Sequence, residues 1–134
     1  MSYFDLREIE TRNRRELLEF VASEVAYGEM RIATCMNPQM GAWLGEVFRP
    51  NGGTGGDPLW AIAHIPESGL LGKFQVWRGD DIDAVEETEI YGAEEFIAEL
   101  INQFHVYLSQ CPEHKSIVDQ IIKSMPEYRG KLRT

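Results

Sequence analysis

The sequence predicts an α+β fold: an antiparallel sheet of about four to five strands with an N-terminal helix and two C-terminal helices packed on one face. Two observations lead to this class. Apolar residues recur at three- and four-residue steps near both ends of the chain, as in amphipathic helices, whereas the middle shows alternation and short apolar runs. The strand candidates are joined by loops of only a few residues, and such short loops connect antiparallel hairpins.

A chain of 134 residues is close to the commonest domain size, so we expect a single domain over residues 1–134. With 43% hydrophobic and 26% charged residues, the composition is that of a globular protein and not of a disordered one. The N-terminal residues are polar and lack the apolar core of a secretory signal, and no apolar run approaches the roughly 20 residues that span a bilayer. We therefore expect a soluble, cytoplasmic protein without a membrane segment.

The first element is predicted to be a helix that ends at Gly28. Its apolar positions are Leu17, Leu18, Phe20, Val21 and Val25. Two starts are open, because Asn13 with Glu16 forms a capping-box pattern and Ser2 with Asp5 is an earlier possible cap.

The middle of the chain contains short segments with the patterns of strands. The candidates are Met30–Met36, Ala42–Phe48, Leu59–Ile65 (ending at Pro66), Lys73–Trp77 and Val85–Tyr91. The glycine-rich segment Arg49–Pro58 is expected to be a flexible loop. The last candidate has no clean apolar face, so we expect it at a sheet edge, where charges discourage strand addition.

Two helices are predicted after the strands. A broad apolar face from Phe96 to Leu108 ends before Pro112, and Leu100 is expected in its core. A shorter apolar pattern from Ile117 to Met125 follows, with Pro126 beyond its end. With the helices on one face, the other face of the sheet is left wet or available to a partner.

Trp43, Trp60 and Trp77 are spaced 17 residues apart, but the residues around them differ too much for an internal repeat. We expect at least two of these side chains in the core. A tryptophan on the open sheet face near acidic residues would be a natural anchor for a partner, because Trp and Tyr dominate interface hot spots.

The net charge of −9 is concentrated in one segment. Residues 80–99 hold nine acids and no Lys or Arg, while the rest of the chain balances 13 acids with 13 bases. The negative electrostatic field of this segment disfavours binding to nucleic acid and favours binding to a basic protein partner. Glu94, Glu95 and Glu99 are explained by the start and surface of a helix, where acids in the first turn offset the dipole.

The unexplained part of this segment is the predicted partner-binding site. Its residues are Asp80, Asp81, Asp83, Glu86, Glu87 and Glu89, with Trp77 as the neighbouring anchor. The alternative is a solvated surface whose short carboxylates bond to backbone amides in a turn. The segment lacks the residue order of a calcium-binding EF-hand loop.

The sequence contains no catalytic signature, so an enzyme is the less favoured class and no catalytic residue is predicted. The glycine-rich loop lacks the Lys and the following helix of a phosphate-binding loop. Cys111 and His114 offer two metal ligands, and His105, six residues before Cys111, points to another side of a continuous helix. We predict no metal and no cofactor, with a Cys35–Cys111 disulfide left open as an alternative to free thiols.

The profile of a small, acidic domain without catalytic motifs is similar to that of bacterial immunity or inhibitor proteins and of secretion chaperones. The leading hypothesis is an immunity-type protein that neutralises a basic protein, such as a nuclease toxin. The alternatives are a chaperone or adaptor that binds through the open sheet face, and a small enzyme with a site near the glycine-rich loop and His64.

Overall fold

The computed structural model describes residues 3–35, 42–49, 53–56, 60–67, 70–79 and 86–132. The elements follow one another as a long helix, a short helix, four strands and two further helices. They are α1 (Tyr3–Ala33), α2 (Ala42–Phe48), β1 (Gly53–Gly56), β2 (Trp60–Glu67), β3 (Leu70–Gly79), β4 (Glu86–Gly92), α3 (Ala93–Gln110), the 3₁₀ turn η1 (Pro112–His114) and α4 (Lys115–Leu132).

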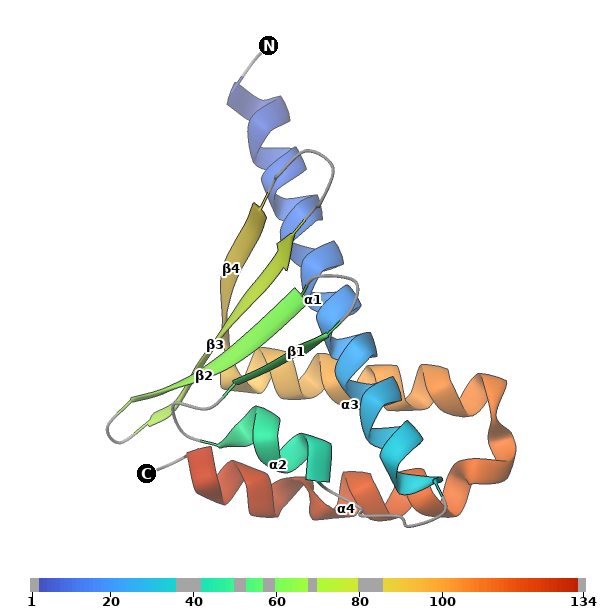
Figure 1. The fold of residues 1–134 in the computed structure, drawn as a ribbon. Helices are drawn as coiled ribbons and strands as arrows, with labels where there is room; N and C mark the ends of the chain where they lie inside the picture. The colour runs from blue at the N-terminus through green and yellow to red at the C-terminus, as the bar shows by residue number, and fades with distance from the viewer. Residues whose placement is uncertain are drawn as a thin grey trace.

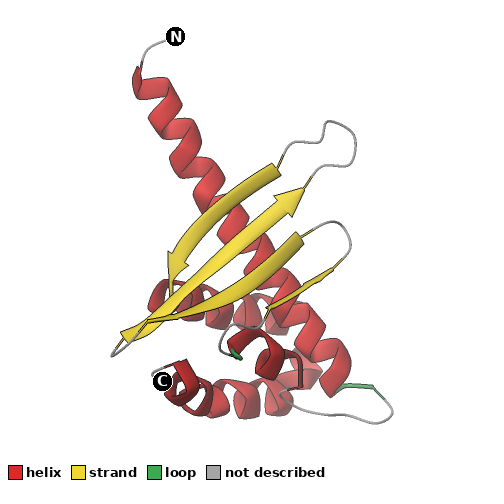
Figure 2. Cartoon of the chain, turned by 60° about the vertical axis from the view of Figure 1, so that its left-hand side comes forward, coloured by secondary structure: helices red, strands yellow, loops and turns green. Residues whose placement is uncertain are grey.

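The strands form one antiparallel sheet in the order β1-β2-β3-β4, so each strand pairs with its neighbour in the chain. The helices lie behind the sheet on one side, and none of the described helices lies on the other side (Figures 1 and 2). This confirms the predicted α+β class, with the N-terminal helix and the two C-terminal helices on one face. The last predicted strand is β4, and it lies at a sheet edge as expected.

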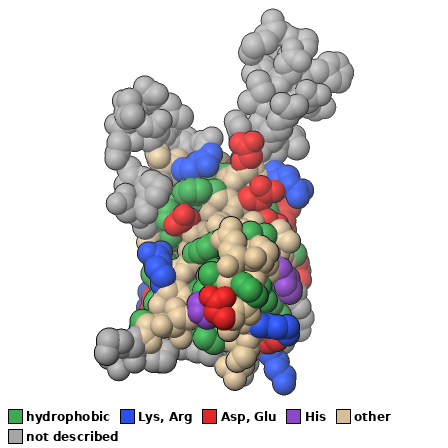
Figure 3. Space-filling view, turned by 90° about the vertical axis from the view of Figure 1, so that its right-hand side faces the viewer, with side chains coloured by type: hydrophobic (Ala, Val, Ile, Leu, Met, Phe, Trp, Pro, Cys, Tyr) green, Lys and Arg blue, Asp and Glu red, His purple; other side chains and the backbone are tan. Residues whose placement is uncertain are grey.

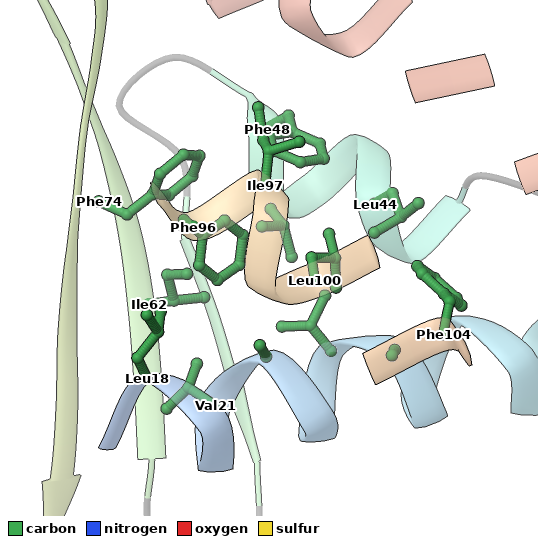
Figure 4. Packing of buried hydrophobic residues seen from close by; sticks show 14 of the residues in the cluster. Leu18, Val21, Leu44, Phe48, Ile62, Phe74, Phe96, Ile97, Leu100 and Phe104 are labelled. Atoms are coloured by element: carbon green, nitrogen blue, oxygen red, sulfur yellow. The ribbon is translucent and has the colours of Figure 1, made fainter. Parts of the chain in front are cut away.

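The hydrophobic core fills the space between the sheet and the helices (Figure 4). Phe74 from β3 meets Phe96 from α3 at a ring-centroid distance of 4.6 Å, and Phe48 from α2 packs edge-on against both rings. Leu100 is fully buried, as its place in the helical pattern predicts. Three elements that are distant in sequence therefore meet at one aromatic cluster.

The first helix begins at Tyr3 and continues to Ala33, and a turn follows at residues 34–35, so the prediction of an end at Gly28 and of a strand over Met30–Met36 was wrong for residues up to 35. Met36 lies outside the described residues. The earlier start is correct, and Asn13 is inside the helix rather than at its cap. Gly28 permits close packing instead of ending the helix, because a Cβ there would lie 2.8 Å from the Trp43 indole nitrogen.

The predicted strand Ala42–Phe48 is the helix α2. Leu44, Val47 and Phe48 are all buried, and their spacing of three and four residues is helical. The backbone N–H of Leu44 donates to the buried Glu29 carboxylate at 3.2 Å, which satisfies one of the free amides in the first turn. An apolar run this short is compatible with a strand and with a helix, and the side chain that caps α2 belongs to another helix.

The remaining corrections concern element ends. Gly53–Gly56, predicted as part of a loop, is the short edge strand β1. β2 passes Pro66 and ends at Glu67, with an irregular register between Ile65 and Glu67. α4 continues beyond Pro126 to Leu132, although the sequence placed this proline after the helix end.

Candidate functional site

One face of the sheet is turned away from the helices, and we call it the open face. Along β2 and β3 the buried residues Ile62, His64, Phe74 and Val76 point toward the helices, so the residues between them point outward. The described side chains of the open face are Ala61, Ala63, Ile65, Lys73, Gln75, Trp77, Thr88 and Ile90. Lys73 is the charged member of this set, and it pairs with Glu67 at 3.3 Å. The described side chains of the open face are therefore close to neutral in total charge.

Trp77 lies on the open face, between Ala61 of β2 and Thr88 of β4 in the strand register. Its side chain is half-buried. The other two tryptophans are on the helix side: Trp60 is buried, and Trp43 packs against it at 6.5 Å between ring centroids. The expectation that at least two tryptophans pack in the core is confirmed, and the third has the position that suits a partner anchor.

The acidic segment connects β3 to the edge strand β4. Asp80, Asp81 and Asp83 lie outside the described residues. Glu86 and Glu87 begin β4, where their backbones pair with Gly79 and Arg78. Their side-chain positions are not among the described ones.

Glu89 is opposite Val76 in the register, which turns its side chain toward the helix side at the sheet edge. There it meets Arg14 of α1, with 3.8 Å between Nε and a carboxylate oxygen. The predicted site residues therefore divide between the open face, which carries Trp77, and the helix side, which carries Glu89.

Arg14 connects α1 to the acidic part of the chain. Its guanidinium donates to the Glu95 carboxylate at 2.9 Å and to the Ile90 carbonyl oxygen at 3.1 Å, and it lies over the Tyr91 ring at 4.4 Å. The hydrogen bond to Glu95 is the main reason why the pKa of Arg14 rises, although burial opposes it. The carboxylates of Glu89 and Glu95 thus have a local base, which the sequence did not reveal because Arg14 is distant in the chain.

Tyr91 is a second contact between β4 and α1. Its side chain is fully buried, and its hydroxyl donates to the backbone oxygen of Arg14. Burial raises the pKa of Tyr91 to about 12, because the phenolate is poorly solvated there.

This pKa predicts a loss of stability at alkaline pH. The folded state holds the Tyr91 proton more tightly than the unfolded chain, whose tyrosine pKa is about 10. The stabilisation is therefore complete below pH about 10 and is lost as the pH rises toward about 12. In Tyr91→Phe, we expect the alkaline fall in unfolding free energy to be smaller by about 1–2 kcal/mol. Urea unfolding at several pH values measures it, and equal falls in both proteins would contradict the assignment.

The histidines considered as catalytic or metal-binding residues occupy different sites. His64 is buried beneath the helices and stacks on Phe74 at a centroid distance of 5.0 Å. His105 is exposed on α3. Cys111 and His114 come together at the corner between α3 and α4, where Glu113 joins them. Cys35 and Cys111 are free thiols.

Comparisons with family models, with curated proteins and with solved structures gave no match. No helix in the described part of the chain has the length and apolar character needed to cross a membrane.

Proposed function

We propose that the protein is a noncatalytic binding protein that neutralises a basic protein partner, such as a nuclease toxin. The observation that carries the proposal is the position of Trp77 on the open face of β3, three residues before the acidic connection to β4 begins. The binding residues are those predicted from the sequence: Trp77 with Asp80, Asp81, Asp83, Glu86, Glu87 and Glu89.

The open face supports this proposal because it resembles the centre of an interface. Fully buried interface cores are poor in charged residues and rich in aromatic ones, and charges gather at the rim. Trp77 is surrounded by the small or neutral residues Ala61, Gln75 and Thr88. The acidic segment follows at the end of the same strand, where its charge attracts a cationic surface and speeds the encounter.

Arg14 changes the expected contribution of the individual acids. Glu89 already has a cation at 3.8 Å, so a partner's Lys or Arg must compete with Arg14 for this carboxylate. The two side chains are 38% and 40% exposed, so solvent weakens the pair and such an exchange costs little. We expect the other five acids to contribute more to attraction than Glu89.

The test begins with cross-linking of the full-length protein in extracts of its own cells and identification of the attached partner. We expect a protein with a cationic surface, and binding that weakens as salt increases. Trp77→Ala should weaken binding by about 30-fold, the effect of a hot-spot residue. Replacing the six acids by their amides should lower the association rate constant by about tenfold or more at low salt.

The matched control removes the same number of charges elsewhere. It changes six acids outside the segment to their amides: Glu16, Glu19, Glu24, Glu46, Asp119 and Glu127. This variant should keep most of the affinity and of the association rate. Equal losses in the two amide variants would show a general effect of net charge, and unchanged affinity in both the Trp77 and the acidic variants would refute the proposal.

One observation favours a second candidate, an adaptor or chaperone that binds an apolar segment. Ile65 and Ile90 are 38% and 49% exposed, and both belong to the open face. Binding of this kind is nearly independent of salt, because burial of apolar surface and not charge supplies the affinity. Ile90→Ser would weaken such binding as strongly as Trp77→Ala, whereas the amide substitutions would leave it unchanged.

A further inference from the structure

Three possible metal ligands converge where α3 ends and α4 begins. One ligand atom from each of Cys111, Glu113 and His114 lies within 4.8 Å of the others. The cause is the 3₁₀ turn η1, in which the His114 N–H donates to the Cys111 carbonyl oxygen at 3.1 Å. A 3₁₀ turn has three residues per turn, so side chains three positions apart lie one above the other. Cys111 is the residue just before this turn, and the 4.8 Å limit on the ligand distances shows that it faces the same side as His114.

Tyr107 holds this corner from the protein interior. Its ring is stacked on His114 at an interplanar angle of 13°, and its hydroxyl forms a hydrogen bond with the His114 Nδ1 atom. The Tyr107 side chain is buried and packs edge-on against Tyr27 at 5.3 Å. A phenol anchored in this way orients the imidazole, as hydrogen-bonding groups around metal ligands generally do.

The ligands are available to an ion. Lys115, the nearest base in sequence, pairs with Asp119 at 2.7 Å, and within the described residues Glu113 forms no ion pair. Cys111 forms no disulfide, and its side chain is in hydrogen-bonding contact with Tyr107, the residue that also holds His114. The last turn of α3 contains no basic residue to offset its negative end. Figure 3 looks onto this end of the molecule and shows histidine and acidic side chains side by side at the surface.

We propose that this corner binds Zn²⁺ through the Cys111 Sγ atom, a carboxylate oxygen of Glu113 and a ring nitrogen of His114, with water as the fourth ligand. A thiolate with an imidazole favours zinc over calcium or magnesium, which prefer oxygen ligands alone. Tetrahedral zinc separates its ligand atoms by about 3.5 Å, given the usual bond lengths. Small side-chain rotations close the site, and the exposed Glu113 is free to make them.

The test uses the full chain, kept reduced by a phosphine and free of chelators, with Co²⁺ as the spectroscopic probe and Zn²⁺ as the competitor. We expect one equivalent of Co²⁺ to produce a thiolate-to-cobalt charge-transfer band and the strong visible bands of a tetrahedral ion, and Zn²⁺ to remove both. Cys111→Ser should abolish the charge-transfer band. His114→Ala and Glu113→Gln should each weaken Zn²⁺ binding by about tenfold or more.

The chain provides matched controls in its other cysteine and in an exposed histidine. Cys35→Ser and His105→Ala should leave the spectrum, the stoichiometry and the affinity unchanged. Glu113 is exposed, so its substitution keeps the test valid even if the other variants fold poorly. The proposal is overturned if no charge-transfer band forms, or if the control variants lose binding as the ligand variants do. Neither result bears on partner binding by the open face.

Discussion

Phe96→Ala is expected to lower the free energy of unfolding by about 3–5 kcal/mol. Phe96 is fully buried and touches Phe74 of β3 and Phe48 of α2, at centroid distances of 4.6 and 6.3 Å (Figure 4). Truncation removes the ring at which α2, α3 and the sheet meet. The loss includes the transfer energy of the ring and the cost of the cavity, because rings held by three elements cannot collapse inward.

Phe20→Ala is the matched control, since it removes the same atoms from a half-buried position. The Phe20 ring lies beneath the Arg78 guanidinium at 5.2 Å, and the site opens to solvent. Its loss should be clearly smaller, because water fills the space that the ring leaves. Urea unfolding of both variants measures the difference. Similar losses would mean that the cluster around Phe96 relaxes or that the two positions contribute equally.

The core of the C-terminal half was predictable because the spacing of its apolar residues is compatible with a helix and not with a strand. Phe96, Leu100 and Phe104 recur at helical spacing over a long segment, and all are fully buried in α3. The sheet was predictable for a related reason: β2 and β3 each alternate over enough residues to exclude a helix. Length resolves the ambiguity between periods of two and of 3.6 residues.

The errors arose where a local signal depended on a distant partner. Gly28 has the usual signature of a helix end, but here it makes room for the indole of Trp43. The helical state of Ala42–Phe48 is supported by the carboxylate of Glu29, which belongs to another helix. The two partners of the Glu29–Leu44 contact are 15 residues apart, so local propensity alone could not identify the structure.

The candidate sites differ in how far the sequence could predict them. The nearness of Trp77 to the acidic segment pointed to this residue, and strand alternation then decides its face. Arg14 could not be linked to Glu89 and Glu95, because only the packing of α1 brings them together. The Cys111–His114 pair was set aside because it offers two ligands where zinc generally takes four, and Glu113 was not counted as a third.

Gly72→Val is expected to lower the free energy of unfolding by about 2–4 kcal/mol. Gly72 follows the turn between β2 and β3 with φ of +89°, a backbone conformation that β-branched residues avoid. A Cβ atom there would lie 2.6 Å from the Ile65 carbonyl oxygen and 3.0 Å from the His64 Nε2 atom. The backbone oxygen cannot move without separating the hairpin, so strain and steric conflict act together.

Gly45→Ala also replaces a glycine, but this substitution is expected to stabilise the protein. Gly45 lies inside α2, and a Cβ there would meet no atom within 4 Å. Alanine stabilises a helix more than glycine does, so this variant should gain up to about 1 kcal/mol in unfolding free energy.

If Gly72→Val were as stable as the wild type in urea unfolding, the hairpin must adopt another turn. A turn with one residue more or fewer would shift the register that places Trp77 on the open face, so the stability of one glycine variant also bears on the geometry of the proposed binding surface.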